Sequence, residues 1–150
     1  MKVEEILKTN SPLPLEKKLA INLVLTNNLA TSLMLESLKP FEISIPQFNV
    51  LRILRGQHGK PANLSTIQDR MVNQMSNTSR LIDKLLEKDL VNRTICEENR
   101  RKIEVYITPA GMDLLKKIDP VVADTEQRIA QNLSTEEIEK LNQLLEKLRT

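Results

Sequence analysis

The most informative part of the chain reads QMSNTSRLIDKLLEKDLVNRTICEENRRKIEVYIT and covers residues 74–108. Apolar residues recur every three or four positions in its first half, which predicts a helix from about Gln74 to Lys88. In its second half apolar and polar residues alternate, which predicts strands over 90–95 and 103–108. The link between these strands is charged and mainly basic. The sequence therefore predicts a helix followed by a β-hairpin with a cationic tip.

Two more helices are expected before this stretch. A capping box formed by Ser44 and Gln47 opens the first of them, which ends at the glycines that follow. The second covers residues 64–71 and is capped by either Asn63 or Ser65. About two residues of turn separate it from the next helix. Two helices joined by a short turn and followed by a hairpin have the layout of a winged helix.

Long helices are expected at both ends of the chain. Residues 15–39 contain neither Gly nor Pro and lie between Pro14 and Pro40. Apolar residues cover two sides of this helix, which is more than a small domain usually buries on its first helix. A partner chain is therefore a candidate to cover it. Residues 109–150 predict a helix with a kink or break at Pro120, and then a final amphipathic helix.

The composition fits one mainly helical α+β domain. The chain has 150 residues, of which 40% are hydrophobic, and its net charge is +2. This charge is unevenly distributed, because residues 50–108 carry eleven basic and seven acidic residues, a net charge of +4. Residues 109–150 carry a net charge of −2. A basic middle segment is a weak sign of nucleic-acid binding.

The sequence lacks the residues that several classes of functional site require. The chain has one His, His58, one Cys, Cys96, and no glycine-rich phosphate loop, so we expect no catalytic site, no metal site and no cofactor. A lone Cys fits a reducing cytoplasm. The acidic residues near the start argue against a signal peptide, and no apolar run is long enough to cross a membrane. Both Cys96 and His58 are interpreted as having no special role.

The predicted helix presents one polar stripe that suits the reading of DNA. Asn77, Arg80 and Lys84 lie at positions i, i+3 and i+7, opposite the apolar face. Such a helix can enter the major groove, and a cationic hairpin can reach phosphates or the minor groove. The candidate DNA-binding residues are Gln74, Ser76, Asn77, Thr78, Arg80, Lys84, Arg100, Arg101 and Lys102. For Thr78 the alternative is a half-buried side chain that does not contact DNA.

These motifs together resemble the MarR family of transcriptional regulators over nearly the whole chain. The resemblance is carried by four segments at family-like spacing: Ser44-x-x-Gln47-Phe48-x-Val50-Leu51, Ser79–Leu85, Leu90-Val91-x-Arg93 and Ile107-Thr108-x-x-Gly111. Two positions depart from the family pattern. Asn99 stands where the wing usually has Asp, which removes a charge that would hold an Arg. Asp89 stands where a Gly usually follows the helix, at modest strain.

The resemblance implies a homodimer that binds a palindromic duplex site. It divides the single unit 1–150 into a winged-helix DNA-binding part, 42–108, and dimerisation helices, 15–39 and 109–150. The expected function is a cytoplasmic, sequence-specific DNA-binding regulator, a repressor that responds to a small molecule or stress. Many family members bind small molecules, but the few aromatic residues here leave the ligand-binding residues unassigned. The alternative is a winged-helix protein-interaction module without DNA binding.

Overall fold

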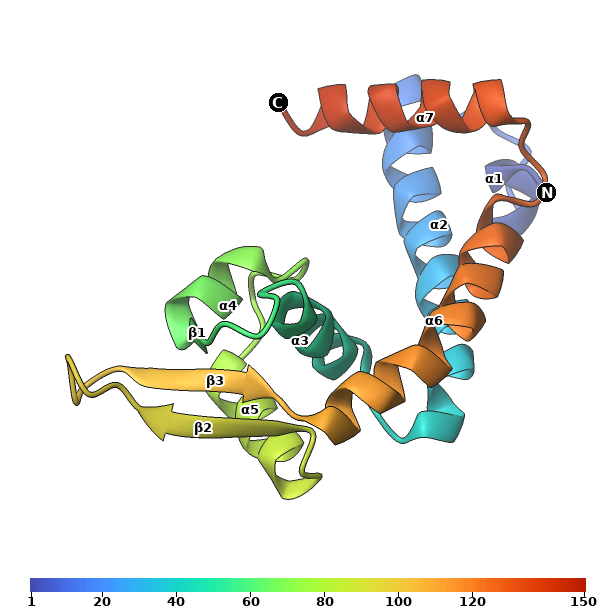
Figure 1. Ribbon diagram of the computed structural model, residues 1–150. Coiled ribbons are helices and arrows are strands. Elements are labelled where there is room, and N and C mark those ends of the chain that lie inside the picture. The colour runs from blue at the N-terminus through green and yellow to red at the C-terminus, as the bar shows by residue number, and fades with distance from the viewer. The chain divides into compact units, whose positions relative to one another are not determined.

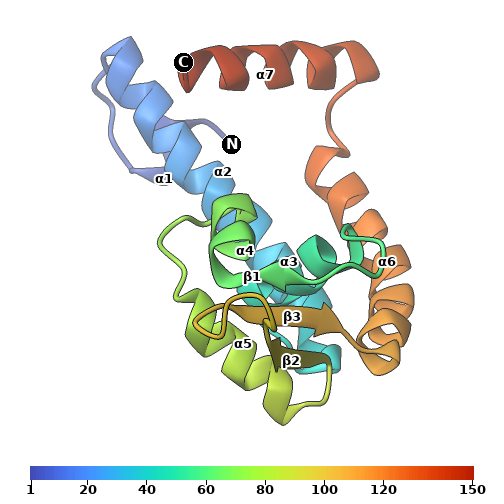
Figure 2. The ribbon, with the colours of Figure 1, turned by 60° about the vertical axis from the view of Figure 1, so that its left-hand side comes forward.

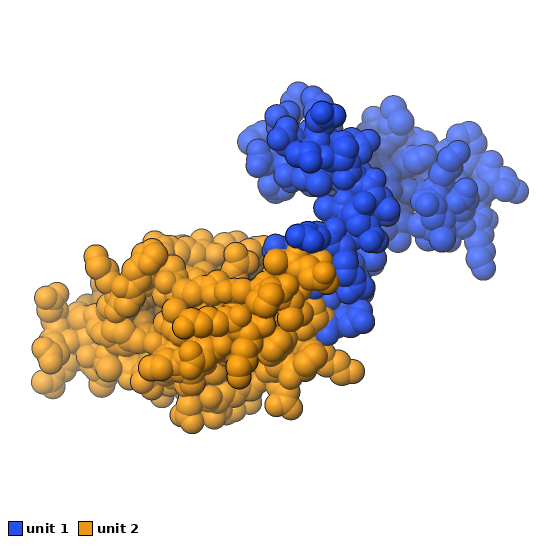
Figure 3. Space-filling view, turned by 45° about the vertical axis from the view of Figure 1, so that its right-hand side comes forward, with its two compact units in different colours: residues 1–36, 125–150 blue, residues 37–124 orange.

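The computed structural model describes residues 1–150 as two compact units, shown in two colours in Figure 3. One unit is Ser37–Asp124, and the other combines Met1–Glu36 with Thr125–Thr150. The helices are α1 (Val3–Ile6), α2 (Leu15–Leu38), the 3-10 turn η1 (Lys39–Phe41), α3 (Ile45–Arg55), α4 (Leu64–Arg70), α5 (Thr78–Glu87), α6 (Pro109–Ala130) and α7 (Thr135–Leu148) (Figure 1). The strands are β1 (Ala62–Asn63), β2 (Val91–Ile95) and β3 (Ile103–Ile107). The predicted fold class, mainly helical with a winged helix-turn-helix, is confirmed.

The unit Ser37–Asp124 is built around a small antiparallel sheet with strand order β1-β3-β2. Ala62 lies opposite Val105, and Val91 lies opposite Ile107, so β3 is the central strand. Helices α3, α4 and α5 pack beside this sheet (Figure 2). The core is made of fully buried side chains from α3, α4, α5, β2, β3 and α6: Val50, Leu51, Leu54, Ile67, Ile82, Leu85, Val91, Val105, Leu115 and Ile118.

The helix starts follow the capping residues closely. The Ser44 hydroxyl accepts a hydrogen bond from the Gln47 backbone N–H at 3.2 Å, and the Gln47 side-chain oxygen accepts one from the Ser44 backbone N–H. The predicted capping box is therefore confirmed. The choice between Asn63 and Ser65 is also settled. The Asn63 side chain accepts a hydrogen bond from the Thr66 N–H at 2.8 Å and is the cap of α4.

The expected start of α5 was wrong. Helix α5 begins at Thr78 rather than near Gln74, because Asn77 is its cap and accepts a hydrogen bond from the Arg80 N–H. The preceding turn is therefore longer than the two residues expected. At Pro120 the sequence predicted a kink or a break, and the break is absent, because helix α6 continues through this residue. A proline removes one hydrogen bond but does not end a helix whose neighbouring turns are packed, and Ile118 and Val122 are both buried.

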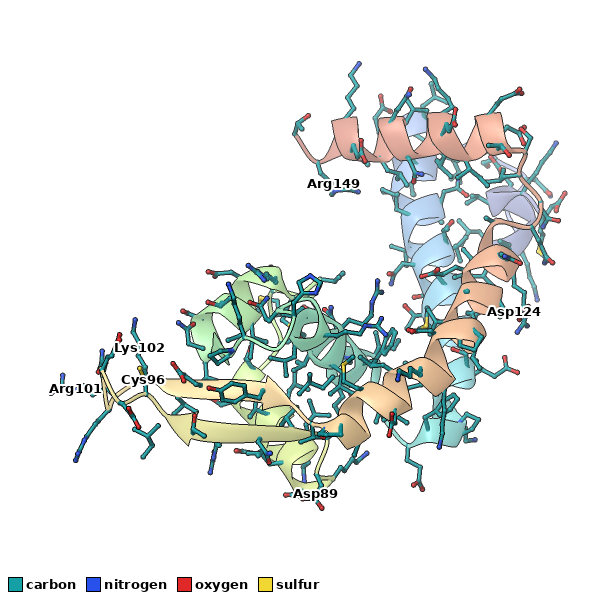
Figure 4. The ribbon with its side chains drawn as sticks, in the orientation of Figure 1. Asp89, Cys96, Arg101, Lys102, Asp124 and Arg149 are labelled. Atoms are coloured by element: carbon teal, nitrogen blue, oxygen red, sulfur yellow. The ribbon has the colours of Figure 1, made fainter.

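A tight corner joins α5, β2 and α6. Asp89 has a positive φ of 58°, as the sequence predicted for the residue after α5, and Figure 4 labels it in the turn before β2. The Thr108 hydroxyl donates to the Asp89 carbonyl at 2.7 Å and accepts from the Gly111 N–H at 3.0 Å. A Cβ on Gly111 would lie 2.4 Å from the Leu90 carbonyl oxygen. Only glycine lets the first turn of α6 lie this close to the Leu90 backbone, just before β2.

The other unit has few buried side chains. Val3 is buried, and Lys18 of α2 forms an ion pair with Glu4 of α1 at 2.9 Å. The hydrogen bond from Lys18 lowers the pKa of Glu4. The rest of the apolar surface of this unit is largely exposed, and α7 buries no residue at all. None of the helices combines the length and the apolar composition that crossing a membrane requires.

Candidate nucleic-acid interface

The outward side of α5 forms one wall of an open hollow of about 470 Å³. Its lining comes from the start of α3, from the α4–α5 turn and from α5 itself: Pro46, Gln47, Asn73, Ser76, Asn77, Arg80, Leu81 and Lys84. Four of the nine predicted DNA-binding residues, Ser76, Asn77, Arg80 and Lys84, therefore lie on one surface. Its polar amides and cations are of the kind that base edges and phosphates accept as partners.

Asn77 caps α5 and lies outside the helix, whereas Arg80 lies within its first turn. Asn77 uses its side-chain oxygen to cap α5, and this leaves its amide NH₂ free to donate. Arg80 is exposed and makes no ion pair, whereas Lys84 lies 3.4 Å from Glu87. The guanidinium of Arg80 is thus the unpaired cation in the middle of this surface.

Two other candidate residues are bound to the protein itself. The Gln74 amide nitrogen donates to the Met71 carbonyl at 2.6 Å, at the end of α4. Thr78 is buried, and its hydroxyl donates to the Gln68 side chain. The Ser76 hydroxyl is different, because it is buried without a hydrogen-bond partner and lines the hollow. Gln74 and Thr78 therefore hold the turn in place, and a direct contact with DNA would require them to release these bonds.

The hairpin between β2 and β3 forms the wing, with three exposed cations at its tip: Arg100, Arg101 and Lys102. Figure 4 shows Arg101 and Lys102 at the free end of the hairpin. None of the three makes an ion pair. The Asn99 side-chain oxygen accepts from the Arg101 N–H at 3.1 Å, and this bond closes the tip without the charge of an Asp. Cys96, labelled nearby, is a free, partly buried thiol.

An ion pair joins the wing to α5. The Arg93 guanidinium of β2 lies 3.2 Å from the Asp83 carboxylate. Both side chains are more than half exposed, so the pair contributes little stability, but it joins the two elements that carry the candidate residues. Asp83 and Arg93 lie in the family motifs of the sequence, but an ion pair between them was not predicted. Asn73, which lines the hollow, was also not among the residues predicted from the sequence.

A second hollow, of about 740 Å³, lies on the same unit, at the C-terminal end of α3. Arg52, Arg55 and His58 line it together with the end of β3 and the start of α6. Arg55 forms two hydrogen bonds with Asp119 of α6, at 2.7 and 3.1 Å, and Arg52 lies over the Phe48 ring. No three His, Cys, Asp or Glu side chains are grouped so that they could hold a metal ion.

Helices α4 and α5, joined by a turn and followed by the β2–β3 wing, define this molecule as a winged helix-turn-helix protein. Residues 43–103 match the family model described as "MarR family". The transcriptional regulator TcaR of Staphylococcus aureus is 32% identical over 122 residues, which are 79% of this chain and 79% of TcaR. The chain belongs to the MarR family of transcriptional regulators. Because this is a family of regulators and not of enzymes, the expectation that the chain is not an enzyme is confirmed.

Two further comparisons extend this assignment. The transcriptional repressor IacR of Pseudomonas putida is 26% identical over 109 residues, which are 73% of this chain and only 64% of IacR. The chain thus matches less than two thirds of the length of that relative. The crystal structure of a MarR variant from E. coli in complex with operator DNA has a TM-score of 0.79, with 24% identity, and covers 87% of this chain and 92% of that one. At this identity the likeness concerns the fold.

Proposed function

We propose that this protein is a sequence-specific repressor that binds double-stranded DNA as a homodimer. The observation that carries the proposal is the shared polar surface of Ser76, Asn77, Arg80 and Lys84 on α5 and its turn, which lies in the same unit as the unpaired cations of the wing. A helix of this kind reads base edges in the major groove, while wing cations contact the backbone. Since DNA is the target, the protein would act in the cytoplasm.

The relatives support this proposal through their names. IacR is a repressor, and the E. coli MarR variant of similar fold was solved with operator DNA. The apolar surface of the other unit supports the dimer. Leu141, Leu144 and Leu148 lie on one face of α7 and are between 42% and 52% exposed. A two-fold dimer places two α5 helices on one duplex and would select a palindromic site.

The deciding experiment is a titration of the chain with duplex DNA selected from a random library, at two salt concentrations. We expect a preferred palindromic sequence, a dimer in the complex, and affinity that falls steeply with salt, because phosphate contacts release counterions. Failure to bind any duplex would contradict the proposal and favour a winged-helix module that binds protein.

The substitution Arg80→Ala tests the reading of bases. A bidentate Arg contact to guanine contributes about 1–3 kcal/mol of discrimination, so the selected site should lose that much while random duplex loses little. Asn92→Ala, an exposed change on β2, is a matched control that should leave the ratio unchanged. Equal losses on both duplexes would leave Arg80 with a phosphate contact only.

The substitution Arg101→Ala tests the wing. Removing one phosphate contact should reduce the slope of log affinity against log salt by about 0.9 per protomer and weaken all duplexes alike. Arg128→Ala, on the last turn of α6, removes the same charge outside the winged helix and is the control. An unchanged slope for Arg101→Ala would remove this residue from the interface.

We also propose that a small anionic molecule regulates this binding. The hollow lined by Arg52, Arg55 and His58 supports the idea, because the Arg52 guanidinium makes no ion pair and is suited to a carboxylate, whereas Arg55 is bonded to Asp119. Benzoate, a compact carboxylate, is a suitable probe in a competition experiment with labelled duplex. We expect release of the duplex by benzoate but not by benzamide, its neutral analogue, and weaker release for Arg52→Gln. Equal action of the two probes would contradict the proposal.

A further inference from the structure

Exposed apolar side chains are rare in the unit Ser37–Asp124, and their positions are informative. Three large apolar residues of this unit are exposed: Val72 at 90%, Met75 at 91% and Ile95 at 64%. Val72 and Met75 lie in the turn between α4 and α5, and Ile95 lies in the wing. The other large apolar side chains of the unit are buried or partly covered. The uncovered ones therefore occur only on the two elements proposed to meet DNA.

The backbone that carries Val72 and Met75 is held by hydrogen bonds. The Val72 N–H donates to the Asn49 side chain of α3 at 2.9 Å, and the Met75 N–H donates to the Asn73 side chain at 3.0 Å. The Gln74 amide donates to the Met71 carbonyl at the end of α4. Figure 2 shows this connection bulging outward between α4 and α5. The backbone N–H groups of Val72 and Met75 are thus both hydrogen-bonded, while their side chains are exposed to solvent.

Val72 and Met75 are adjacent in sequence to residues of the polar surface of α5. Asn73, which follows Val72, and Ser76, which follows Met75, line the same hollow as Arg80. A surface that reads bases in the major groove meets hydrogen-bonding groups and one apolar group, the C5-methyl of thymine. Phosphates offer no apolar surface. The chemistry of Val72 and Met75 therefore matches a thymine methyl and not a phosphate.

We propose that Val72 and Met75 contact thymine C5-methyl groups in the major groove and so select thymine at a fixed position of each half-site. The inference rests on the proposed function and specifies part of the operator. Removing one methyl group removes about 0.8 kcal/mol of apolar burial, which corresponds to about fourfold in affinity per half-site. For a dimer with both half-sites changed, the expected loss is about fifteenfold.

The test replaces thymine by deoxyuridine, one position at a time, in the duplex that the full chain selects from a random library. Deoxyuridine pairs as thymine does and lacks only the methyl group. We expect one thymine in each half-site whose replacement weakens the wild-type protein by about fourfold. Met75→Ala and Val72→Ala should bind the thymine duplex more weakly, and at least one of them should bind both duplexes equally well.

Controls separate this contact from a general disturbance. Ile95→Ala, an exposed apolar residue on the wing, should keep the full dependence on the methyl group. Val72 and Met75 are almost fully exposed, so their variants should retain the melting temperature, the salt dependence and the affinity for random duplex.

Two outcomes would overturn the inference while leaving the proposed function intact. In one, the protein selects a site but no thymine methyl affects its affinity. In the other, both alanine variants keep the wild-type dependence on the methyl group. Absence of any selected sequence is a third outcome, distinct from these, and it would overturn the proposed function and the inference together.

Discussion

The two units differ in how far they bury their apolar side chains. The first unit is Ser37–Asp124, and the second is formed by Met1–Glu36 and Thr125–Thr150. The first unit buries a full set of Leu, Ile and Val side chains within one chain. The second leaves large apolar side chains exposed along α2 and α7, among them Leu15, Leu19, Leu23, Val24, Leu29, Leu35, Leu141, Leu144 and Leu148. Exposed apolar surface on this scale marks an interaction site.

This difference indicates which part of the molecule can be stable alone. Burying a leucine contributes about 1.5–3 kcal/mol, so the core of the first unit can support its own fold. The helices of the second unit bury little within the chain, and in the proposed homodimer they would gain this energy against a second copy. The winged helix is therefore expected to fold within one chain, and the terminal helices to be completed by dimerisation.

The largest effect should come from placing charge on the α7 surface. The double variant Leu141→Asp with Leu144→Asp should be monomeric in sedimentation analysis and should lose about 100-fold or more in affinity for a palindromic duplex, since linked half-sites are worth about 10²–10⁴. Its winged helix should remain folded by circular dichroism. The pair Leu141→Met with Leu144→Met keeps the surface apolar and should remain dimeric. If the Asp variant stays dimeric, the exposed apolar face of α7 does not form the dimer interface.

The next largest effect is expected inside the first unit, at Gly111. Alanine there would bring its Cβ to 2.4 Å from the Leu90 carbonyl oxygen, so α6 must shift. We expect Gly111→Ala to lower the free energy of unfolding in urea by about 1–3 kcal/mol, as overpacked sites do. Ala110→Ser, an exposed change one residue earlier, should stay within about 0.5 kcal/mol of wild type. Similar stability of the two variants would show that the corner is adjustable.

A smaller effect is expected for the Arg55–Asp119 pair, which joins α3 to α6. Its geometry is bidentate, but the side chains are 31% and 46% exposed, so water screens the attraction. A double-mutant cycle with Arg55→Met and Asp119→Asn should give a coupling energy of about 0.5–1 kcal/mol in urea unfolding. A much larger coupling would mean that the junction is more rigid than its exposure implies.

The smallest effect is expected at Asp89, where the substitution should stabilise the protein and not destabilise it. Asp89 adopts a left-handed φ of 58° with an exposed side chain. Glycine adopts this conformation without strain, so Asp89→Gly should stabilise the protein by about 0.5 kcal/mol, after the entropy cost of glycine in the unfolded chain. Thermal unfolding measures the change. Lys88→Gly, at a residue with negative φ, should destabilise the protein instead.

Local sequence signals predicted much of the first unit correctly. The capping box at Ser44, the left-handed turn at Asp89 and the two strands of the wing were all predicted from neighbouring residues. The start of α5 was not, because Gln74, Ser76 and Asn77 suit both a helix and a turn. The choice between them depends on bonds to distant residues, such as that of Thr78 to Gln68.

The sequence by itself determined the order of the elements, the winged-helix class and the positions of the wing cations, because periodicity, caps and charge are properties of adjacent residues. The tertiary structure decided which polar side chains remain free. Gln74 and Thr78 are used inside the turn, whereas Ser76, Asn77 and Arg80 line one surface. It also showed that Val72 and Met75 have no cover. Hydrogen-bond partners and burial depend on packing between distant segments, which residue spacing does not encode.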